Sequence, residues 1–449
     1  MSARGLILAA PASGHGKTTL TLALLRALRD AGTRAAPAKA GPDYVDPGFH
    51  AAAAGIPSLN LDLWAMRPAT LAALVARLGA ESDLVLCEGA MGMFDGIDAA
   101  GAGSTADLAV ATGWPVVLVV DASAMAASVA ALVAGFARHR AEIPLAGAIL
   151  NRVGGARHEA LLRDALASTL PDLPVLGALP RSRAIALPSR HLGLVPAAEL
   201  DGLEATIAAA ATLAARHVDL ARLVALARPA RVAAAPESDA PLRPLGQRIA
   251  VARDVAFAFA YQAVLEGWRA AGAALLPFSP LADEAPAADC DAVYLPGGYP
   301  ELHAGVLAAA ARFKSGLAAA AARGAAIYGE CGGYMTLGRG LVDADGARHA
   351  MAGLLPLETS FADRRLHLGY REAALSASCA LGPRGASFRG HEFHYARVVA
   401  EGPAETLFAA ADSRGESLGD AGLRVGSVAG SFLHLIDRRP AAPGPLSGW

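Results

Sequence analysis

The chain has 449 residues, of which 54% are hydrophobic, and a formal net charge of −2. This length exceeds what one hydrophobic core usually supports, so it predicts two domains. The near-neutral balance provides no basic excess for binding nucleic acid or an anionic membrane surface, and we expect neither partner.

The cysteines and the apolar runs indicate a cytoplasmic protein. Cys87, Cys290, Cys331 and Cys379 form no Cys-x-x-Cys pair, which argues against a zinc site or a disulfide framework and fits a reducing compartment. The apolar run at the start of the chain is too short for a secretion signal. The most apolar window, residues 108–137, is interrupted by Asp121 and does not predict a membrane span.

Short apolar runs alternate with helical stretches along the chain. In the first half, the apolar runs lie at 5–10, 84–87, 116–120 and 146–150, and helical stretches at 17–31 and 200–227. A second series has apolar runs at 249–252, 273–277, 292–295 and 325–328. Unbroken apolar runs separated by helices predict parallel sheets covered on both faces.

The fold class that follows is α/β, with two doubly wound domains. We expect the first domain over residues 1–227 and the second over 248–440. Between them, residues 228–247 are rich in proline, alanine and charge, which predicts a linker.

The stretch A-P-A-S-G-H-G-K-T-T (10–19) follows a predicted strand and opens a predicted helix. Its glycines allow backbone N–H groups to surround phosphate oxygens, while Lys17 reaches the β- and γ-phosphates and the Thr18 hydroxyl binds Mg²⁺. Pro11 stands where the strict motif has glycine. The sequence therefore predicts an ATP site that includes Ser13, Gly14, His15, Gly16, Lys17, Thr18 and Thr19.

Acidic residues follow two other stretches of the first half. Lys39, Asp43 and Asp46 lie in a Gly/Pro-containing loop, and Glu88 ends a buried strand before a glycine-rich turn that carries Asp95. A Mg-ATP site needs carboxylates at the ends of neighbouring strands. The alternatives are an exposed, solubilising acid for Glu88 and ordinary turn-forming roles for the two aspartates Asp46 and Asp95.

Cys331 lies in G-E-C-G-G-Y-M (329–335), where an apolar run meets a predicted helix. A sharp strand-to-helix turn exposes such a side chain at a helix N-terminus, where we expect the dipole to favour the reactive thiolate. His434, far away in the sequence, is the candidate base, and an inert core cysteine is the alternative. His391 and His394 are only weak evidence for a metal site.

These motifs resemble two known families. The stretches L-P-G-G-Y-P-E-L-H (295–303), G-E-C-G-G-Y-M (329–335), G-H-E-F-H-Y (390–395) and S-F-L-H (431–434) resemble class I glutamine amidotransferases of the cobyric acid synthase type. The first half is similar to dethiobiotin synthetase-like P-loop ATPases. The stretches K-A-G-P-D-Y-V-D-P (39–47) and P-S-R-H-L-G-L-V-P-A-A-E (188–199) resemble the cobyrinic (or hydrogenobyrinic) acid a,c-diamide synthases in particular.

The resemblance implies roles for individual residues. Cys331 would attack glutamine, His434 would activate it, and Gly298 and Gly332 would supply oxyanion donors. Ile436 stands where ordinary class I members have a glutamate, which implies a dyad in place of a triad. In the first half, the implied Mg²⁺ ligands are Thr18, Asp43 and Glu88, the implied ATP contacts include Lys39 and an adenine-reading Asn151, and the candidate substrate positions are Tyr44, Asp46 and Asp95.

The implied activity is ATP- and glutamine-dependent amidation of the a and c acetate side chains of a corrin polycarboxylate, through an acyl phosphate and internally delivered ammonia. Cobyric acid synthase-like amidation of other side chains and a non-catalytic P-loop regulator remain alternatives. The sequence leaves open whether the ring contains cobalt and whether the chain forms a homodimer.

Overall fold

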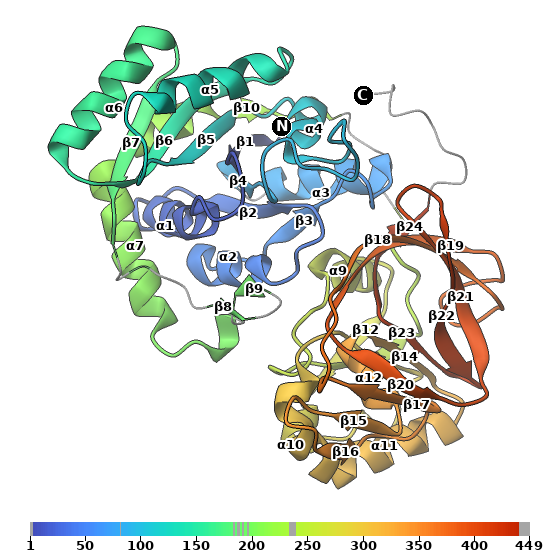
Figure 1. The fold of residues 1–449 in the computed structure, drawn as a ribbon. Coiled ribbons are helices and arrows are strands. Elements are labelled where there is room, and N and C mark those ends of the chain that lie inside the picture. Colours follow the sequence, from blue (N-terminus) through green and yellow to red (C-terminus); the bar gives the residue numbers. More distant parts are fainter. Residues whose placement is uncertain are drawn as a thin grey trace. The chain divides into compact units, whose positions relative to one another are not determined.

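In a computed structural model, the described residues are 3–80, 82–182, 185, 189–190, 193–194, 197–232 and 239–439. They divide into two compact units. One unit holds the described residues of 1–64 and 71–238, and the other those of 65–70 and 239–443. Figure 1 labels the helices and strands of both units. The division falls within the expected linker, although Arg228–Pro229 of that linker forms a short strand, β10, of the first unit's sheet.

The first unit is built on a parallel sheet in the order β3-β2-β4-β1-β5-β6-β7. Four predicted apolar runs are confirmed as its strands β1, β4, β5 and β6. The strands are β1 (Arg4–Ala9), β2 (Ala35–Ala40), β3 (Leu59–Leu61), β4 (Leu84–Glu88), β5 (Val116–Asp121), β6 (Leu145–Val153) and β7 (Val175–Pro180). A separate two-stranded sheet pairs β8 (Ser189–Arg190) with β9 (Gly193–Leu194).

Helices connect these strands (Figure 1). They are α1 (Lys17–Asp30), α2 (Asp46–Ala54), α3 (Pro68–Ala80), α4 (Thr105–Thr112), α5 (Ser128–His139), α6 (Ala156–Thr169), α7 (Leu203–His217) and α8 (Leu220–Leu226), with a 3₁₀ turn at Ala197–Glu199. The predicted helical stretch 200–227 is two helices because Val218 is extended and the Asp219 carboxylate caps α8 by accepting from the Arg222 N–H. Within the motif at 188–199, residues 188, 191–192 and 195–196 lie outside the described residues.

The second unit is built on a mixed sheet in the order β12-β11-β13-β14-β23-β22-β21-β18-β19-β24. The strands from β12 to β23 are parallel and the others are antiparallel. The strands are β11 (Arg248–Ala252), β12 (Ala274–Phe278), β13 (Ala292–Leu295), β14 (Ala326–Glu330), β18 (His367–Leu375), β19 (Ser387–His394), β21 (Glu405–Asp412), β22 (Ser417–Val425), β23 (Val428–Ser431) and β24 (Leu433–Arg438).

The parallel half of this sheet confirms the predicted apolar runs, whereas the antiparallel half was not predicted. A strand such as β22 is mostly exposed, so it lacks an unbroken apolar run. A second small sheet contains β15 (Gly340–Val342), β16 (Arg348–Ala350), β17 (Leu357–Ser360) and β20 (Arg397–Glu401). The helices are α9 (Gln262–Ala270), α10 (Ala304–Ala309), α11 (Ala311–Ala322) and α12 (Gly332–Leu337), with 3₁₀ turns at Pro280–Ala282 and Pro300–His303.

Residues 65–70 belong to the second unit although they lie between β3 and α3 in the sequence. The Arg67 backbone N–H and Nε donate to the two carboxylate oxygens of Asp437, at 2.8 and 2.9 Å. Asp437 is fully buried, so this pairing provides the charge that its carboxylate needs.

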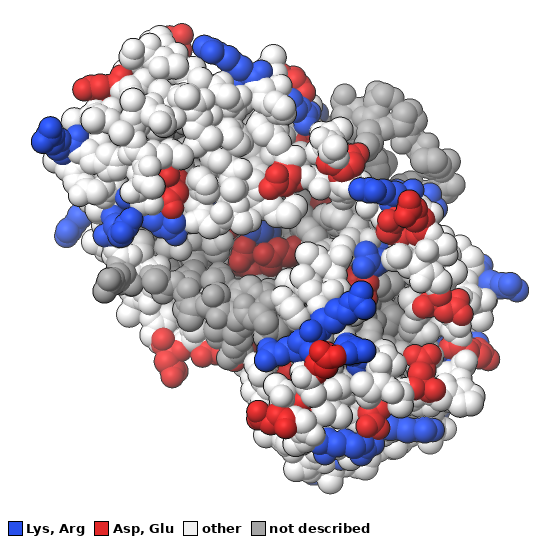
Figure 2. Space-filling view, in the orientation of Figure 1, with Lys and Arg blue, Asp and Glu red and all other residues white. Residues whose placement is uncertain are grey.

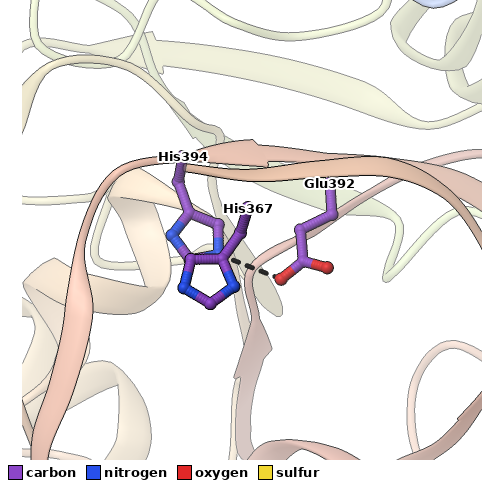
Figure 3. Close-up of side chains that lie close together, drawn as sticks. All are labelled: His367, Glu392 and His394. Atoms are coloured by element: carbon purple, nitrogen blue, oxygen red, sulfur yellow. Dashed lines mark hydrogen bonds and ion pairs between the residues drawn. The ribbon is translucent and has the colours of Figure 1, made fainter. Parts of the chain in front are cut away.

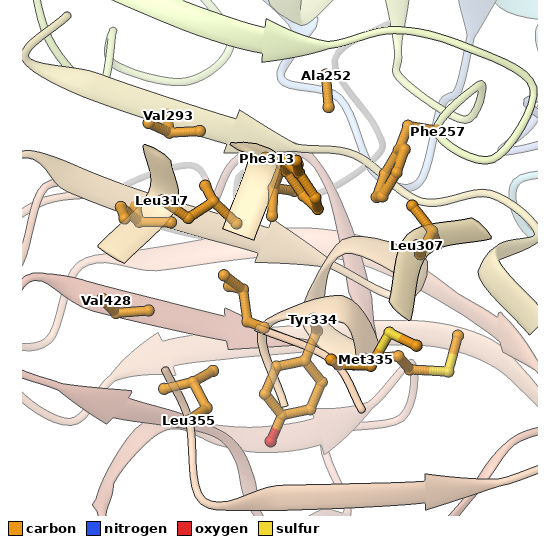
Figure 4. Close-up of a cluster of buried hydrophobic side chains, with 14 of the residues drawn as sticks. Ala252, Phe257, Val293, Leu307, Phe313, Leu317, Tyr334, Met335, Leu355 and Val428 are labelled. Atoms are coloured by element: carbon orange, nitrogen blue, oxygen red, sulfur yellow. The ribbon is translucent and has the colours of Figure 1, made fainter. Parts of the chain in front are cut away.

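The second unit has a core of aromatic and aliphatic side chains between α10, α11 and the sheet (Figure 4). Phe313 and Leu317 of α11 and Val293 of β13 are fully buried in it. Because Phe313 and Leu317 lie four residues apart, on one face of α11, burial of their apolar surface holds this helix against the sheet.

Charged side chains of both signs are intermixed on the face shown in Figure 2, and uncharged side chains cover most of it. Among the described residues, no helix is both long and apolar enough to cross a bilayer.

The substitution Phe313→Ala tests the packing of the second unit. Removing a fully buried ring should lower the free energy of unfolding of this unit by about 3–5 kcal/mol. Urea unfolding followed by circular dichroism measures the change. The control Val306→Ala, at a half-exposed position of α10, should cost less than about 0.5 kcal/mol. Equal effects of the two substitutions would contradict the assignment.

Candidate active sites

The phosphate loop lies between β1 and α1, as predicted. Gly14 and Gly16 have φ angles of +85° and +87°, a conformation that favours glycine. A Cβ atom on Gly16 would also lie 2.3 Å from Nδ2 of Asn151. That Nδ2 donates to the His15 carbonyl at 2.9 Å, and Arg152 donates to the Gly14 carbonyl at 2.9 Å. The end of β6 therefore holds the loop in shape, and Asn151 has a structural contact beside its expected role towards adenine.

Glu88 ends β4 and is fully buried at the centre of a polar cluster. Its Oε1 accepts from the Thr18 hydroxyl at 2.6 Å and from Lys39 Nζ at 3.1 Å. Its Oε2 lies 2.6 Å from Nε2 of His50. Asp46 joins the cluster through Lys39 Nζ at 2.5 Å and the Thr18 hydroxyl at 3.4 Å. His50 was not expected in this cluster, because no sequence motif marks a histidine within a helix as a partner of a distant carboxylate.

The charges of this cluster balance one another. Burial alone would raise the pKa of Glu88, but the Lys39 ammonium and the hydrogen bonds from His50 and Thr18 hold it well below its usual range. Burial and the neighbouring Asp43 raise the pKa of Asp46. Burial, together with the nearby Lys39 charge, lowers the pKa of Lys17. The cluster thus keeps an ionised carboxylate beside a threonine hydroxyl, which is the oxygen chemistry that Mg²⁺ requires.

Two of the three expected Mg²⁺ ligands contact each other, and the third does not contact either of them in the described hydrogen bonds. Thr18 and Glu88 are in contact, whereas the described contacts of the Asp43 carboxylate are with the N–H groups of Val45 and Asp46, at 2.7 and 3.1 Å. Those bonds fix the start of α2. The second carboxylate beside Thr18, after that of Glu88, is that of Asp46 at 3.4 Å, which favours Asp46 over Asp43 as a ligand.

The remaining predicted residues of this unit surround the cluster or lie farther along its loops. Lys17 is buried and its Nζ donates to the Met91 carbonyl. Tyr44 is also buried, and the Asp95 carboxylate accepts from the Gly92 N–H at 2.8 Å, which stabilises the turn after β4. Ser13 and Gly14 are exposed. Exposed loop residues beside a buried, charge-balanced cluster fit a site that a nucleotide reaches from solvent.

Cys331 occupies the turn between β14 and α12, as predicted, and has φ +46° and ψ −103°. Its N–H donates to the Ser431 carbonyl of the neighbouring strand β23 at 2.8 Å. A non-glycine residue at positive φ is strained, and such strain is typical of residues that the fold holds in place for function.

Glycines permit the close backbone approaches around this turn. A Cβ atom on Gly333 would lie 1.9 Å from the Leu295 carbonyl oxygen, and one on Gly332 would lie 2.9 Å from the Gly298 nitrogen. A Cβ atom on Gly297 would lie 2.2 Å from Cε1 of His434. Cys331, His434 and the predicted oxyanion donors Gly298 and Gly332 therefore come together in one region of the second unit.

Burial determines the protonation of the two candidate catalytic groups. It raises the pKa of the Cys331 thiol far above its usual range, and the nearby Glu301 carboxylate adds to this effect. It lowers the pKa of His434 to about 3. Burial therefore opposes the effect expected of the helix dipole, which is to favour the thiolate. Helix α12 supplies only six residues to that dipole.

Three further side chains lie close together near this region, as Figure 3 shows. The rings of His367 and His394 stack with centroids 4.7 Å apart, and His394 Nε2 lies 3.0 Å from the Glu392 carboxylate. Arg371 Nε donates to the same carboxylate at 2.7 Å. Burial would raise the pKa of Glu392, but the hydrogen bond from His394 and the Arg371 charge lower it to about 2. Its negative charge is therefore already neutralised by protein groups.

Comparison with known proteins identifies both units. Residues 6–195 match the model of the CobQ/CobB/MinD/ParA nucleotide binding domain, and residues 248–441 match that of the CobB/CobQ-like glutamine amidotransferase domain.

Curated relatives extend the match to the whole chain. A hydrogenobyrinate a,c-diamide synthase from Sinorhizobium sp is 57% identical over 98% of this chain and 100% of its own length. The proteins of that name from Brucella suis and Mesorhizobium japonicum are 57% and 51% identical, over 97% and 98% of this chain and 98% and 100% of their own lengths.

Alkylation of Cys331 tests the protonation assigned above. Because the thiol is neutral in the free protein, its reaction with iodoacetamide should be slow at pH 7 and rise about tenfold per pH unit up to pH 9. Peptide mass spectrometry measures the rate, with the half-buried Cys379 as the internal comparison. A rate that is already constant around neutral pH would mean that the thiolate is present before substrate binds.

Proposed function

The chain belongs to the family of the hydrogenobyrinate a,c-diamide synthases, and on this basis we propose that it amidates the a and c acetate side chains of hydrogenobyrinic acid with ATP and glutamine. The observation that carries the proposal is that one chain holds both reaction centres. These are a phosphate loop with a charge-balanced carboxylate cluster and a strained cysteine turn beside a buried histidine.

The first unit activates the carboxylic acid. A substrate carboxylate attacks the γ-phosphorus of ATP, ADP leaves, and an acyl phosphate forms. Lys17 neutralises charge on the transferred phosphoryl group, and the phosphate-loop N–H groups hold the remaining phosphates. Thr18, Glu88 and Asp46 would hold Mg²⁺, which supplies further charge neutralisation on the phosphates when it is bound. Ammonia then displaces phosphate from the acyl carbon and the amide forms.

The second unit supplies the ammonia. The Cys331 thiol gives its proton to His434 as its sulfur attacks the amide carbon of glutamine. The N–H groups of Gly298 and Gly332 stabilise the oxyanion. His434 then gives the proton to the leaving nitrogen, so ammonia departs and a thioester remains for water to hydrolyse. Burial keeps His434 neutral in the free protein, as a base must be, but it also disfavours the imidazolium that forms, so this step needs a group that stabilises the positive charge.

The metal-free ring is the proposed substrate because the relatives carry that name. Cobyrinic acid, which contains cobalt, and other side chains of the ring are the alternatives. Incubation with each ring, followed by mass spectrometry of the products, decides between them. We place the reaction in the cytoplasm, which fits the free cysteines among the described residues.

The substitution Cys331→Ala should separate the two half-reactions. It removes the nucleophile, so glutamine-dependent diamide formation should fall to the background rate, whereas amidation with added ammonium should stay near the wild-type rate. Chromatography of the mono- and diamide products measures both. The matched control is Cys379→Ala, which should leave both rates unchanged. Normal diamide formation from glutamine by Cys331→Ala would show that another group is the nucleophile.

The substitution Lys17→Ala should impair amidation from either nitrogen source. Loss of its charge beside the transferred phosphoryl group should lower the rate on the order of 100- to 1,000-fold. The control is Lys314→Ala, on α11 of the second unit. Lys17→Ala should still hydrolyse glutamine at Cys331, and this activity checks that the variant is folded. Unimpaired amidation by Lys17→Ala would refute the phosphate-loop assignment.

A further inference from the structure

Glu330 ends β14 and directly precedes the nucleophile Cys331, and it is 2% exposed. Its Oε2 accepts from the Tyr294 hydroxyl at 2.7 Å, and its Oε1 accepts from the Leu435 N–H at 3.1 Å. The same Oε2 lies 3.9 Å from Nδ1 of His434. Two strands in addition to its own thus direct this carboxylate towards the catalytic base.

His434 otherwise has no acidic residue at the usual position along its own strand. The residue two places later, where related glutaminases carry a glutamate, is Ile436, an apolar side chain that is buried. The Glu392 charge raises the pKa of His434, but Arg371 and His394 already bind this carboxylate. Glu330 is the carboxylate whose oxygen faces Nδ1 of the ring.

We propose that Glu330 is a positioning residue for the glutaminase reaction, which orients His434 and stabilises its imidazolium in place of an acid at position 436. This inference rests on the proposed function. When His434 Nε2 takes the thiol proton from Cys331, the Nδ1–H keeps its proton and faces the Glu330 carboxylate across a buried, weakly screened gap. The 3.9 Å separation is an ion-pair distance, and catalytic contacts of this kind shorten when substrate binds.

The hydrogen bonds of Glu330 suit this role. The Tyr294 hydroxyl and the Leu435 N–H fix both carboxylate oxygens, so the side chain cannot rotate away from the ring. Their donors are uncharged, and no cation pairs with Glu330 in the contacts described. The carboxylate therefore keeps its charge available for the imidazolium that forms during turnover.

The pH dependence follows from the groups around the dyad. Burial raises the pKa of Glu330 to about 7, although Tyr294, Leu435 and Tyr328 oppose the effect. Burial, with His391 and His394, lowers the pKa of His434 to about 3. Burial, together with the Glu330 charge, raises the pKa values of Tyr294 and Tyr328 well above their usual range. Because Glu330 acts in its ionised form, glutaminase activity should be low below pH 7 and rise as pH passes through that value.

Glutamine hydrolysis by Glu330→Gln tests the inference. The amide keeps the size of the side chain but removes its charge, so kcat should fall about 100- to 10,000-fold with little change in KM, and the rise near pH 7 should disappear. Amidation with ammonium should be unchanged. Glu330→Asp should recover part of kcat. A kcat within about threefold of wild type, or an equal loss of ammonium-dependent amidation, would overturn the proposal.

Tyr294→Phe is the companion variant. It removes a hydrogen bond that stabilises the ionised Glu330 carboxylate, so the rise in glutaminase activity should move to higher pH. At pH values above the rise, the activity should equal that of the wild type. If Glu330→Gln does not fold, the pH dependence of glutaminase activity in Tyr294→Phe and in Glu330→Asp tests the proposal instead. The same pH dependence as wild type in both variants would overturn it. Absence of glutaminase activity in the wild type would instead refute the proposed function itself.

Discussion

A carboxylate buried at the carboxyl end of a parallel strand is the constraint on which both sites depend. Glu88 ends β4 of the first unit and Glu330 ends β14 of the second, and each is almost fully removed from solvent. A buried acid is costly unless charges or hydrogen bonds compensate it. The residues of each site therefore surround one carboxylate. Whether charges or uncharged hydrogen-bond donors stabilise that carboxylate determines what the site can do.

The two sites compensate their acids in different ways. Lys39 and His50 keep Glu88 ionised, and the resulting cluster is prepared for a cation and for phosphates. Glu330 has a hydroxyl and a backbone N–H but no paired cation among its described contacts, so its charge is available to the histidine of the nucleophile turn. The Glu88 site thus suits ligands that are always charged, namely a cation and phosphates. The Glu330 carboxylate instead faces a positive charge that appears on His434 only during turnover.

Features that a local sequence pattern encodes could be predicted from the sequence alone. The phosphate loop, the end of β4 at Glu88 and the turn at Cys331 follow from short apolar runs that meet glycine-rich turns, and the structure has each of them. Features that depend on pairing distant strands could not be read in this way. Glu330 meets His434 although β14 and β24 are separated by five strands in the order of the mixed sheet, and the hydrogen bond from the Leu435 N–H of β24 to Glu330 shows that the two strands approach each other. The raised pKa of Cys331 follows from burial, which a motif does not encode.

Among the described residues Glu330 is a buried acid without a paired cation, and burial raises its pKa to about 7, so it titrates near neutrality beside the base. Infrared difference spectroscopy of the carboxyl bands, comparing wild type with Glu330→Gln across pH 5 to 9, tests it most directly. We expect a protonated carboxylic acid band at pH 5 that converts to carboxylate at about pH 7 and is absent from the variant. A Glu330 that is already fully ionised at pH 5 would contradict it.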